Sequence, residues 1–200
     1  MSQTLSTMVE LGTIAPAFEL QDVVSGGAIG RDDVVALGTS GGLLVMFICV
    51  HCPYVRHVEE ELARIGVDYA GKLGITAISS NNIMEFPQDG PDEMKLQAKR
   101  LGLRFPYLFD ETQEVAREYN AACTPDFFLF DKDLKLVYRG QLDDSRPRRS
   151  GGGNDIPVTG KDLRAALDAV IAGKRPDPNQ RTSLGCNIKW KAKPFNPNKH

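Results

Sequence analysis

The chain has 200 residues, of which 42% are hydrophobic and 25% charged, and its formal net charge at pH 7 is -2. This composition is that of an ordinary globular protein with one buried core. The near-neutral charge gives no reason to expect binding to nucleic acid or to a membrane. No segment approaches the roughly 18 continuous apolar residues of a membrane helix, and the start of the chain lacks a signal-peptide pattern, so we expect a soluble cytoplasmic protein.

The four cysteines matter more for their spacing than for their number. Four cysteines are too few for a disulfide framework that stabilises a chain of this size. In a reducing compartment they stay thiols unless they take part in redox chemistry or metal binding. Cys49 and Cys52 form a C-x-x-C motif, whereas Cys123 and Cys186 stand apart from it and from each other. What such a motif does depends on the secondary structure that carries it.

The first predicted elements place the C-x-x-C motif between a strand and a helix. Pro16–Leu20 fits a short edge strand, where proline is tolerated. Leu43–Ile48 is a continuous apolar run between two glycines and the motif, which is typical of a strand buried on both faces. Beyond the motif, four apolar residues recur at helical spacing: Val55, Val58, Leu62 and Ile65.

Strands and helices continue to alternate in the next part of the chain. Ile75–Ser79 predicts a second buried strand. Pro91 and Gly102 predict the start and the end of a helix. Asp110 and Gln113 resemble a capping box, which predicts the start of another helix at this point.

A hairpin and a last helix complete the predicted domain. Phe127–Phe130 and Leu136–Tyr138 are predicted to be antiparallel strands joined by a short polar turn. Thr159 and Asp162 predict the cap of a helix that ends at Gly173. This order of elements predicts an α/β fold with a mixed central sheet flanked by helices on both sides.

Two segments fall outside this core. Arg146–Asn154 is first basic and then glycine-rich, and we expect a mobile loop there rather than a phosphate-binding one. Residues 174–200 contain several lysines and prolines, with Cys186 and Trp190 near the middle, and we expect an irregular tail. The predicted organisation is one domain over residues 1–173, with the tail packed on it or loosely attached.

The placement of the motif favours redox chemistry. A thiol reacts as its thiolate, and the positive end of a helix dipole favours that anion at a helix N-terminus. Pro53 costs the helix nothing in its first turn, and His51 adds stabilisation to a thiolate when it is protonated. The spacing of Cys49 and Cys52 lets a disulfide close between them. The motif therefore supplies a nucleophile and a resolving thiol together.

The chain resembles the peroxiredoxin-like branch of the thioredoxin superfamily, the redoxin or AhpC/TSA group. The resemblance runs from about Gly12 to Ile171 and rests on GTIAPAFELQD, LLVMFICVHCP, ITAISSNN, GLRFPYLFDETQEVAREYN, and TPDFFLFDKD followed by YRG. It implies a thioredoxin-like fold with an N-terminal extension. It also implies that the Thr124–Pro125 bond is the cis-proline bond that faces the C-x-x-C motif in thioredoxins.

The match to peroxiredoxins is incomplete at the positions that activate a peroxide. Peroxiredoxins carry a P-x-x-x-T-x-x-C signature and a distant arginine. When Cys52 is aligned with the peroxidatic cysteine, Val45 takes the proline position and Cys49 the threonine position. The region of the arginine reads Cys123-Thr124-Pro125. The thioredoxin alignment fits better, with Cys49 as the exposed attacking thiol and Cys52 as the resolving thiol.

We therefore expect a thiol-disulfide oxidoreductase, with weak thiol peroxidase activity at most. Its catalytic residues are Cys49, Cys52 and His51 in the motif, with Thr124 and Pro125 opposite them. We expect no cofactor. The implied substrates are protein or small-molecule disulfides, or peroxides, and the implied electron donor is a thiol such as thioredoxin or glutathione. The oligomeric state is left open.

Other interpretations also stay open from the sequence. One is a peroxiredoxin-type peroxidase with Cys52 as the peroxidatic cysteine. Another is a thioredoxin-fold protein without turnover that binds zinc or copper through Cys49 and Cys52, with His51, Cys123 or Cys186 brought close. Cys123, beside the predicted cis-proline, and Cys186, in a tail segment with apolar anchors, are candidate resolving thiols. Each is also compatible with a plain structural thiol.

Overall fold

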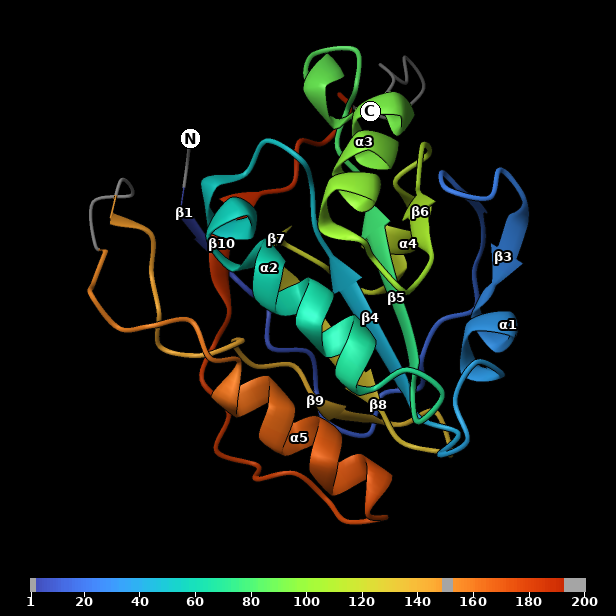
Figure 1. The fold of residues 1–200 in the computed structure, drawn as a ribbon, viewed down its shortest axis with the longest axis vertical. Helices are drawn as coiled ribbons and strands as arrows, with labels where there is room; N and C mark the ends of the chain where they lie inside the picture. The colour runs from blue at the N-terminus through green and yellow to red at the C-terminus, as the bar shows by residue number, and fades with distance from the viewer. Residues whose placement is uncertain (1–2, 149–152, 193–200) are drawn as a thin grey trace, which may run out of the picture.

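The computed structural model describes residues 3–148 and 153–192, and a seven-stranded sheet forms its centre (Figure 1). The strands are β2 (Glu19–Asp22), β3 (Ala28–Gly30), β4 (Leu43–Phe47), β5 (Gly74–Ser79), β6 (Tyr107–Phe109), β8 (Asp126–Phe130) and β9 (Leu136–Tyr138). They lie in the order β3-β2-β6-β5-β4-β8-β9. The neighbours β4, β5 and β6 run parallel and the other pairs antiparallel, so the sheet is mixed, as predicted.

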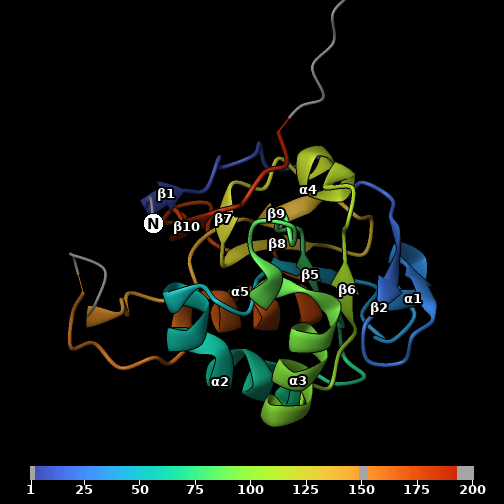
Figure 2. The same cartoon turned by 90° about the horizontal axis from the view of Figure 1, so that it is seen from above.

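Helices cover both faces of this sheet (Figure 2). The helical segments are α1 (Arg31–Val35), α2 (Pro53–Asp68), the 3-10 turn η1 (Pro87–Asp89), α3 (Pro91–Leu101), α4 (Glu114–Glu118) and α5 (Lys161–Ile171). Helices α2, α3 and α5 lie on one side and α4 on the other. Buried apolar side chains form a separate cluster on each side. Among the described residues, no helix is long and apolar enough to cross a membrane.

The central strand β4 explains the long apolar run in the sequence. It pairs with β5 on one side and β8 on the other, and all of its residues are buried. Val45 and Phe47 pack in one apolar cluster, while Leu44 and Met46 pack in the other. Both faces of the strand therefore need apolar side chains. The end of β4 then delivers the C-x-x-C motif to the start of α2.

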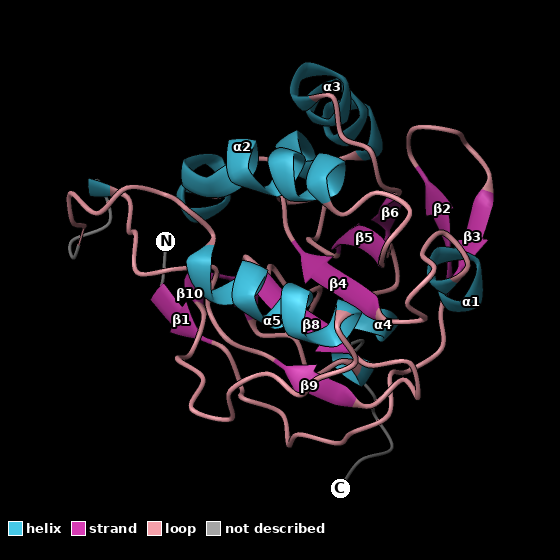
Figure 3. Cartoon of the chain, turned by 60° about the horizontal axis from the view of Figure 1, so that its bottom comes forward, coloured by secondary structure: helices cyan, strands magenta, loops and turns pink. Residues whose placement is uncertain are grey.

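A second sheet, which the sequence did not predict, joins the two ends of the chain. It contains β1 (Gln3–Leu5), β10 (Leu184–Asn187) and β7 (Cys123–Thr124), with β10 in the middle and both pairings antiparallel. Figure 3 shows β1 and β10 side by side. The tail thus contributes a paired strand, while its division from the domain at residue 173 stays a prediction.

The strand predicted over Pro16–Leu20 is found further along the chain and inside the sheet. β2 pairs with β3 on one side and with β6 on the other, so it is not an edge strand. Pro16 precedes the strand, and its missing N–H therefore costs the ladder no hydrogen bond.

The predicted capping box at Asp110 and Gln113 does not form. Gln113 has left-handed backbone geometry (φ 65°), and α4 begins only after it. The Asp110 carboxylate reaches past Gln113 and accepts the backbone N–H of Ala116 at 2.9 Å. Asp110 therefore contributes to the start of α4 from a buried position rather than as a local N-cap.

The predicted cap of the last helix is also wrong, because its role passes to a distant residue. Gly160, not Thr159, immediately precedes α5. The carboxylate of Asp143 accepts the backbone N–H groups of Thr159 and Gly160, both at 2.7 Å. A buried carboxylate thus satisfies two N–H groups at the start of the helix.

The loop Arg146–Asn154 was predicted to be mobile, and its residues 149–152 lie outside the described residues. Its described ends are held together. The Arg146 guanidinium donates to the backbone oxygens of Asp143 and Ser145, both at 2.7 Å. The backbone N–H of Arg146 donates to the Asn154 side chain at 3.1 Å. The base of this loop is therefore closed by hydrogen bonds.

Candidate active site

The C-x-x-C motif lies in the turn between β4 and α2. Cys52 is the N-cap residue of α2, and its carbonyl accepts the N–H of Arg56 at 2.9 Å, the first bond of the helix. Pro53 follows at the first helical position, as predicted. Cys49 lies before the helix, in the segment that links β4 to α2. The helix dipole and free N–H groups therefore act most directly on Cys52.

Thr124 and Pro125 lie opposite the two thiols. The Thr124–Pro125 bond is cis, as the resemblance implied. The Thr124 hydroxyl is 3.4 Å from the Cys49 sulfur, and the Cys52 sulfur lies 3.1 Å from the Thr124 carbonyl, to which it donates a hydrogen bond only while it is protonated. One residue thus contacts both sulfurs, through its side chain and its backbone.

Asp89 holds the two residues between the cysteines, and sequence reasoning missed it. Its side chain is completely buried. One carboxylate oxygen accepts the backbone N–H groups of Val50 and His51 at 2.9 and 3.0 Å. The other is 2.5 Å from Nδ1 of His51 and accepts the Asn81 amide at 2.8 Å. The carboxylate therefore clamps the turn. Nothing in the local pattern around Asp89 pointed to this contact.

The His51 ring faces Asp89 and stacks on Phe86, with ring centroids 5.5 Å apart and planes 10° from parallel. Ligand atoms of Cys49, His51 and Asp89 lie within 4.8 Å of one another. Both oxygens of the carboxylate already accept hydrogen bonds, however. A zinc or copper ion would have to displace the His51 ring from Asp89. Among the described residues, this metal-like group includes neither Cys123 nor Cys186.

The electrostatics of the two thiols run against the expectation that Cys49 is the attacking thiol. Its thiol donates a hydrogen bond to Cys52, and with burial and the nearby charge of Asp89 this raises the pKa of Cys49. Burial also raises the pKa of Cys52, but hydrogen bonds from Cys186, Cys49 and Thr124 outweigh it and bring that pKa below its usual value. Of the two thiols, Cys52 is therefore the one whose pKa these contacts lower.

Both thiols are enclosed by protein, so the predicted exposed attacking thiol is not found. Cys49 is 1% exposed and Cys52 is fully buried. A thioredoxin-like mechanism needs one sulfur within reach of the substrate. Here access requires a movement of the residues around the turn, and the strand β10 lies next to the start of α2 (Figure 1).

The two remaining cysteines are both near the motif, but they differ in their contacts. The Cys186 thiol donates a hydrogen bond to Cys52, and this bond together with burial raises the pKa of Cys186. The Cys123 thiol donates to the Pro125 carbonyl at 3.6 Å, and burial raises its pKa. Cys186 is therefore placed for exchange with Cys52, whereas Cys123 faces the backbone.

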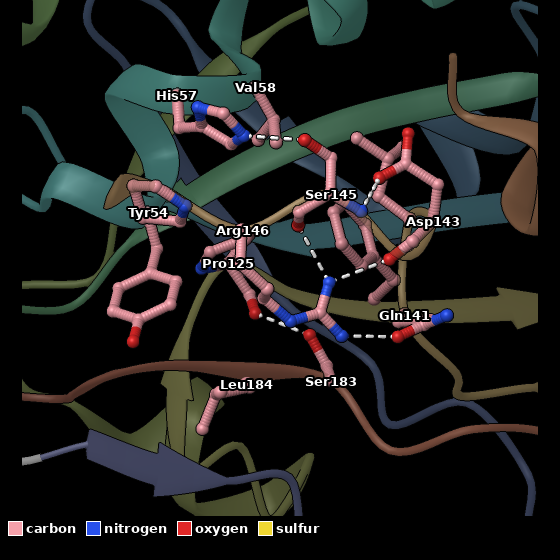
Figure 4. A pocket seen from close by; sticks show the side chains of 13 residues that line it. Tyr54, His57, Val58, Pro125, Gln141, Asp143, Ser145, Arg146, Ser183 and Leu184 are labelled. Carbon is pink, nitrogen blue, oxygen red and sulfur yellow. Dashed lines mark hydrogen bonds between the residues drawn. The ribbon is translucent and has the colours of Figure 1, made fainter. Parts of the chain in front are cut away.

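A small pocket is lined in part by Pro125 (Figure 4). Tyr54 and His57 of α2 line it together with Arg146 and Ser183. His57 is half-buried, lies 2.7 Å from the Ser145 hydroxyl, and has its pKa lowered by burial. The guanidinium of Arg146 donates to the backbone oxygens of Asp143 and Ser145 and to the Gln141 side chain.

A C-x-x-C turn ahead of a helix, facing a cis-proline on a mixed sheet, defines a redox protein of the thioredoxin-like fold. The chain belongs to the AhpC/TSA family, whose family model matches residues 11–139. This finding confirms the predicted redoxin branch of the thioredoxin superfamily and the fold class.

Two solved structures are similar over almost the whole chain. An uncharacterized conserved protein from Geobacillus kaustophilus is 49% identical, with a TM-score of 0.89 over 96% of this chain and 98% of that one. A hypothetical protein from Sinorhizobium meliloti 1021 is 46% identical, with a TM-score of 0.88 over 95% of this chain and 100% of that one.

A more distant structure shares the fold alone. The thioredoxin domain of a thiol-disulfide oxidoreductase from Bacteroides vulgatus is 18% identical, with a TM-score of 0.53 over 66% of this chain and 88% of that one. No curated protein matches the chain. Membership of the AhpC/TSA family supports a thioredoxin-like redox role in general terms.

Proposed function

We propose that the protein is a thiol-disulfide oxidoreductase in which Cys49 and Cys52 form the redox couple. The observation that carries this proposal is the position of both sulfurs at the start of α2, where the side chain of Thr124 contacts Cys49 and its carbonyl contacts Cys52. A thiolate at Cys52 and a neutral thiol at Cys49 are the two partners that disulfide exchange needs.

The reaction with a disulfide substrate begins with attack by the Cys52 thiolate on one substrate sulfur. The substrate S–S bond breaks, a mixed disulfide forms on Cys52, and the first substrate thiolate leaves. Cys49 then loses its proton to that thiolate and attacks the Cys52 sulfur. The Cys49–Cys52 bond forms as the second substrate thiolate leaves. A dithiol donor returns the couple to the reduced state, so the protein transfers two electrons per cycle.

The test uses the Cys186→Ser variant, so that only the proposed couple can close near Cys52. Incubation with oxidised glutathione should form a Cys49–Cys52 disulfide, which peptide mass mapping locates and dithiothreitol reverses. Adding Cys52→Ser should abolish formation of any such bond, whereas Cys49→Ser should stop at a glutathione adduct on Cys52. If Cys49 and Cys52 both stay reduced in the Cys186→Ser variant, the proposed function is wrong.

A second candidate, a thiol peroxidase with Cys52 as the peroxidatic residue, is favoured by the position of Cys52 at the helix N-terminus. Attack on a hydroperoxide would give a sulfenic acid on Cys52 and release an alcohol, or water from hydrogen peroxide, after which Cys49 would form the disulfide and release water. Val45 and Cys49 replace the proline and threonine of the peroxiredoxin signature. We therefore expect hydrogen peroxide to react with Cys52 little faster than it reacts with an ordinary thiolate. Stopped-flow measurement of thiol oxidation checks this rate, and a value orders of magnitude higher would favour the peroxidase.

A further inference from the structure

The strand β10 occupies the backbone edge beside the cis-proline. It pairs antiparallel with β7, with Cys186 opposite Thr124 and Asn187 opposite Cys123. Gly185, the residue before Cys186, packs directly against the backbone of Thr124, where an added Cβ would lie 2.0 Å from the carbonyl oxygen. Only glycine therefore fits at this position of β10.

Hydrogen bonds on either side of β10 hold it in this position. Before the strand, the Ser183 hydroxyl donates to the Pro125 carbonyl at 2.8 Å, as Figure 4 shows. After it, the N–H of Ile188 donates to the Ala122 carbonyl at 3.1 Å. The N–H of Lys189 donates to the Asn81 side chain at 2.8 Å. The tail is therefore fastened to the site on both sides of Cys186.

This arrangement limits which substrates can reach the site. An extended disulfide-bearing peptide could pair with the backbone of Thr124 as an added strand only if that backbone edge were free. That pairing edge is already taken by β10, and β1 covers the outer edge of β10 in turn. An incoming polypeptide would have to displace β10 and break all of its anchoring hydrogen bonds. A small disulfide needs only a smaller opening to reach the Cys52 sulfur.

We propose that β10 is a built-in partner strand, which fills the position of an extended substrate and presents Cys186 to Cys52 as a third redox thiol. This inference rests on the proposed function, because it concerns the fate of the same Cys52 sulfur. It assigns low-molecular-weight disulfides as the substrate class while β10 is docked. Extended polypeptide disulfides are excluded in that state.

The chemistry is an internal disulfide exchange that needs no further oxidant. Cys186, as a thiolate, attacks the Cys52 sulfur of the Cys49–Cys52 disulfide. The Cys52–Cys186 bond forms, the Cys49–Cys52 bond breaks, and the proton lost by Cys186 passes to the Cys49 thiolate. One disulfide replaces another, so the oxidation state of the chain is unchanged. The product ties β10 covalently to the start of α2.

Disulfide mapping of the full wild-type chain tests this relay. After limited oxidation with oxidised glutathione, we expect a Cys52–Cys186 peptide pair to appear as the Cys49–Cys52 pair declines. The Cys186→Ser variant should retain only the Cys49–Cys52 pair. The Cys123→Ser variant is the matched control and should behave as the wild type does. If the wild type holds only Cys49–Cys52 at equilibrium, the proposed relay is wrong, although the proposed function stands.

Substitution of Gly185 tests the role of the strand itself. Gly185→Ala should push β10 away from Thr124 and raise the rate of insulin disulfide reduction several-fold, while the rate with oxidised glutathione changes little. Circular dichroism checks that the variant is folded, and Trp190 fluorescence reports the displaced tail. Ser183→Ala, which loses one anchoring hydrogen bond, should have a smaller effect in the same direction. A folded Gly185→Ala variant with a displaced tail and an unchanged insulin rate would overturn the proposed exclusion of polypeptides.

Discussion

Asp89 gives the two thiols of the motif different electrostatic surroundings. Its carboxylate is held ionised by the His51 ring, the Asn81 amide and the His51 backbone N–H, which lower its pKa although burial raises it. The resulting negative charge opposes ionisation of Cys49. Cys52 instead receives hydrogen bonds at the N-terminus of α2. A single buried residue thereby helps to decide which sulfur is the thiolate.

The order of ionisation predicts the pattern of alkylation. With iodoacetamide at increasing pH, Cys52 should be modified at lower pH than Cys49, and peptide mass analysis distinguishes the two. Asp89→Asn should move the pH profile of Cys49 alkylation to lower pH because it removes the nearby negative charge. If iodoacetamide labels Cys49 rather than Cys52 at low pH, Cys49 is the attacking thiol and the predicted order of ionisation is wrong.

The Asp89→Asn substitution should also lower the free energy of unfolding by roughly 1–3 kcal/mol, since an amide cannot accept all four hydrogen bonds.

Asp126 predicts a dependence of stability on pH. Burial raises its pKa to about 7, although a hydrogen bond from the backbone N–H of Ala122 acts in the opposite direction. Between about pH 4 and 7 the folded state therefore keeps a proton that the unfolded state has lost, and stability falls as pH rises. Asp126→Asn should raise the free energy of unfolding at about pH 8 by on the order of 4 kcal/mol, with little gain near pH 4. Urea unfolding at both values checks this, and an equal effect at both would contradict it.

At the level of elements, the start of α5 depends on a residue outside the helix. The Asp143 carboxylate accepts the N–H groups of Thr159 and Gly160, and its other oxygen accepts the N–H of Ser145 at 2.9 Å. Because these contacts are buried, their loss leaves polar groups without partners. One carboxylate therefore joins the loop after β9 to the first turn of α5.

Asp143→Ala should consequently lower the free energy of unfolding by about 1–3 kcal/mol. Thr159→Ala is the matched control and should change it by less than about 0.5 kcal/mol, because the Thr159 contact with Asp143 uses the backbone N–H. Thermal and urea unfolding measure both differences. A larger loss for Thr159→Ala would restore the side-chain cap that the sequence predicted.

Across the whole molecule, the tail pairs with the start of the chain and with the strand beside the active site. β10 pairs with β1 from the start of the chain and with β7 beside the active site. Beyond it, Trp190 lies under the Arg117 guanidinium, 4.6 Å from the ring centroid. The backbone N–H of Lys191 donates to the Gln113 side chain at 2.7 Å. These contacts extend the docked segment as far as residue 191.

If the tail and the domain unfold together, Trp190 fluorescence and far-ultraviolet circular dichroism should give the same midpoint in urea. We expect coincident transitions, because the tail cannot leave without breaking the small sheet that contains β7. The Gly185→Ala variant should separate them, with the fluorescence change at lower urea. Separate transitions in the wild type would mean that the tail is an independent, weakly attached segment.

The sequence by itself was enough for the central part of this fold. The apolar run of β4, the helical spacing in α2 and the hairpin of β8 and β9 follow from periodicity between near neighbours. The same local pattern placed Cys49 and Cys52 at a strand-to-helix turn. The resemblance then supplied the cis-proline opposite them. These features depend on residues close together in the chain, or on a motif that a family shares.

Only the tertiary structure decided how the thiols behave. The clamp by Asp89, the closing of the pairing edge by β10 and the burial of both sulfurs involve residues far from the motif in sequence. No periodicity shows which distant carboxylate or glycine will reach the turn. The pKa order of Cys49 and Cys52 follows from those contacts, because burial and nearby charge depend on all the elements packed around a group.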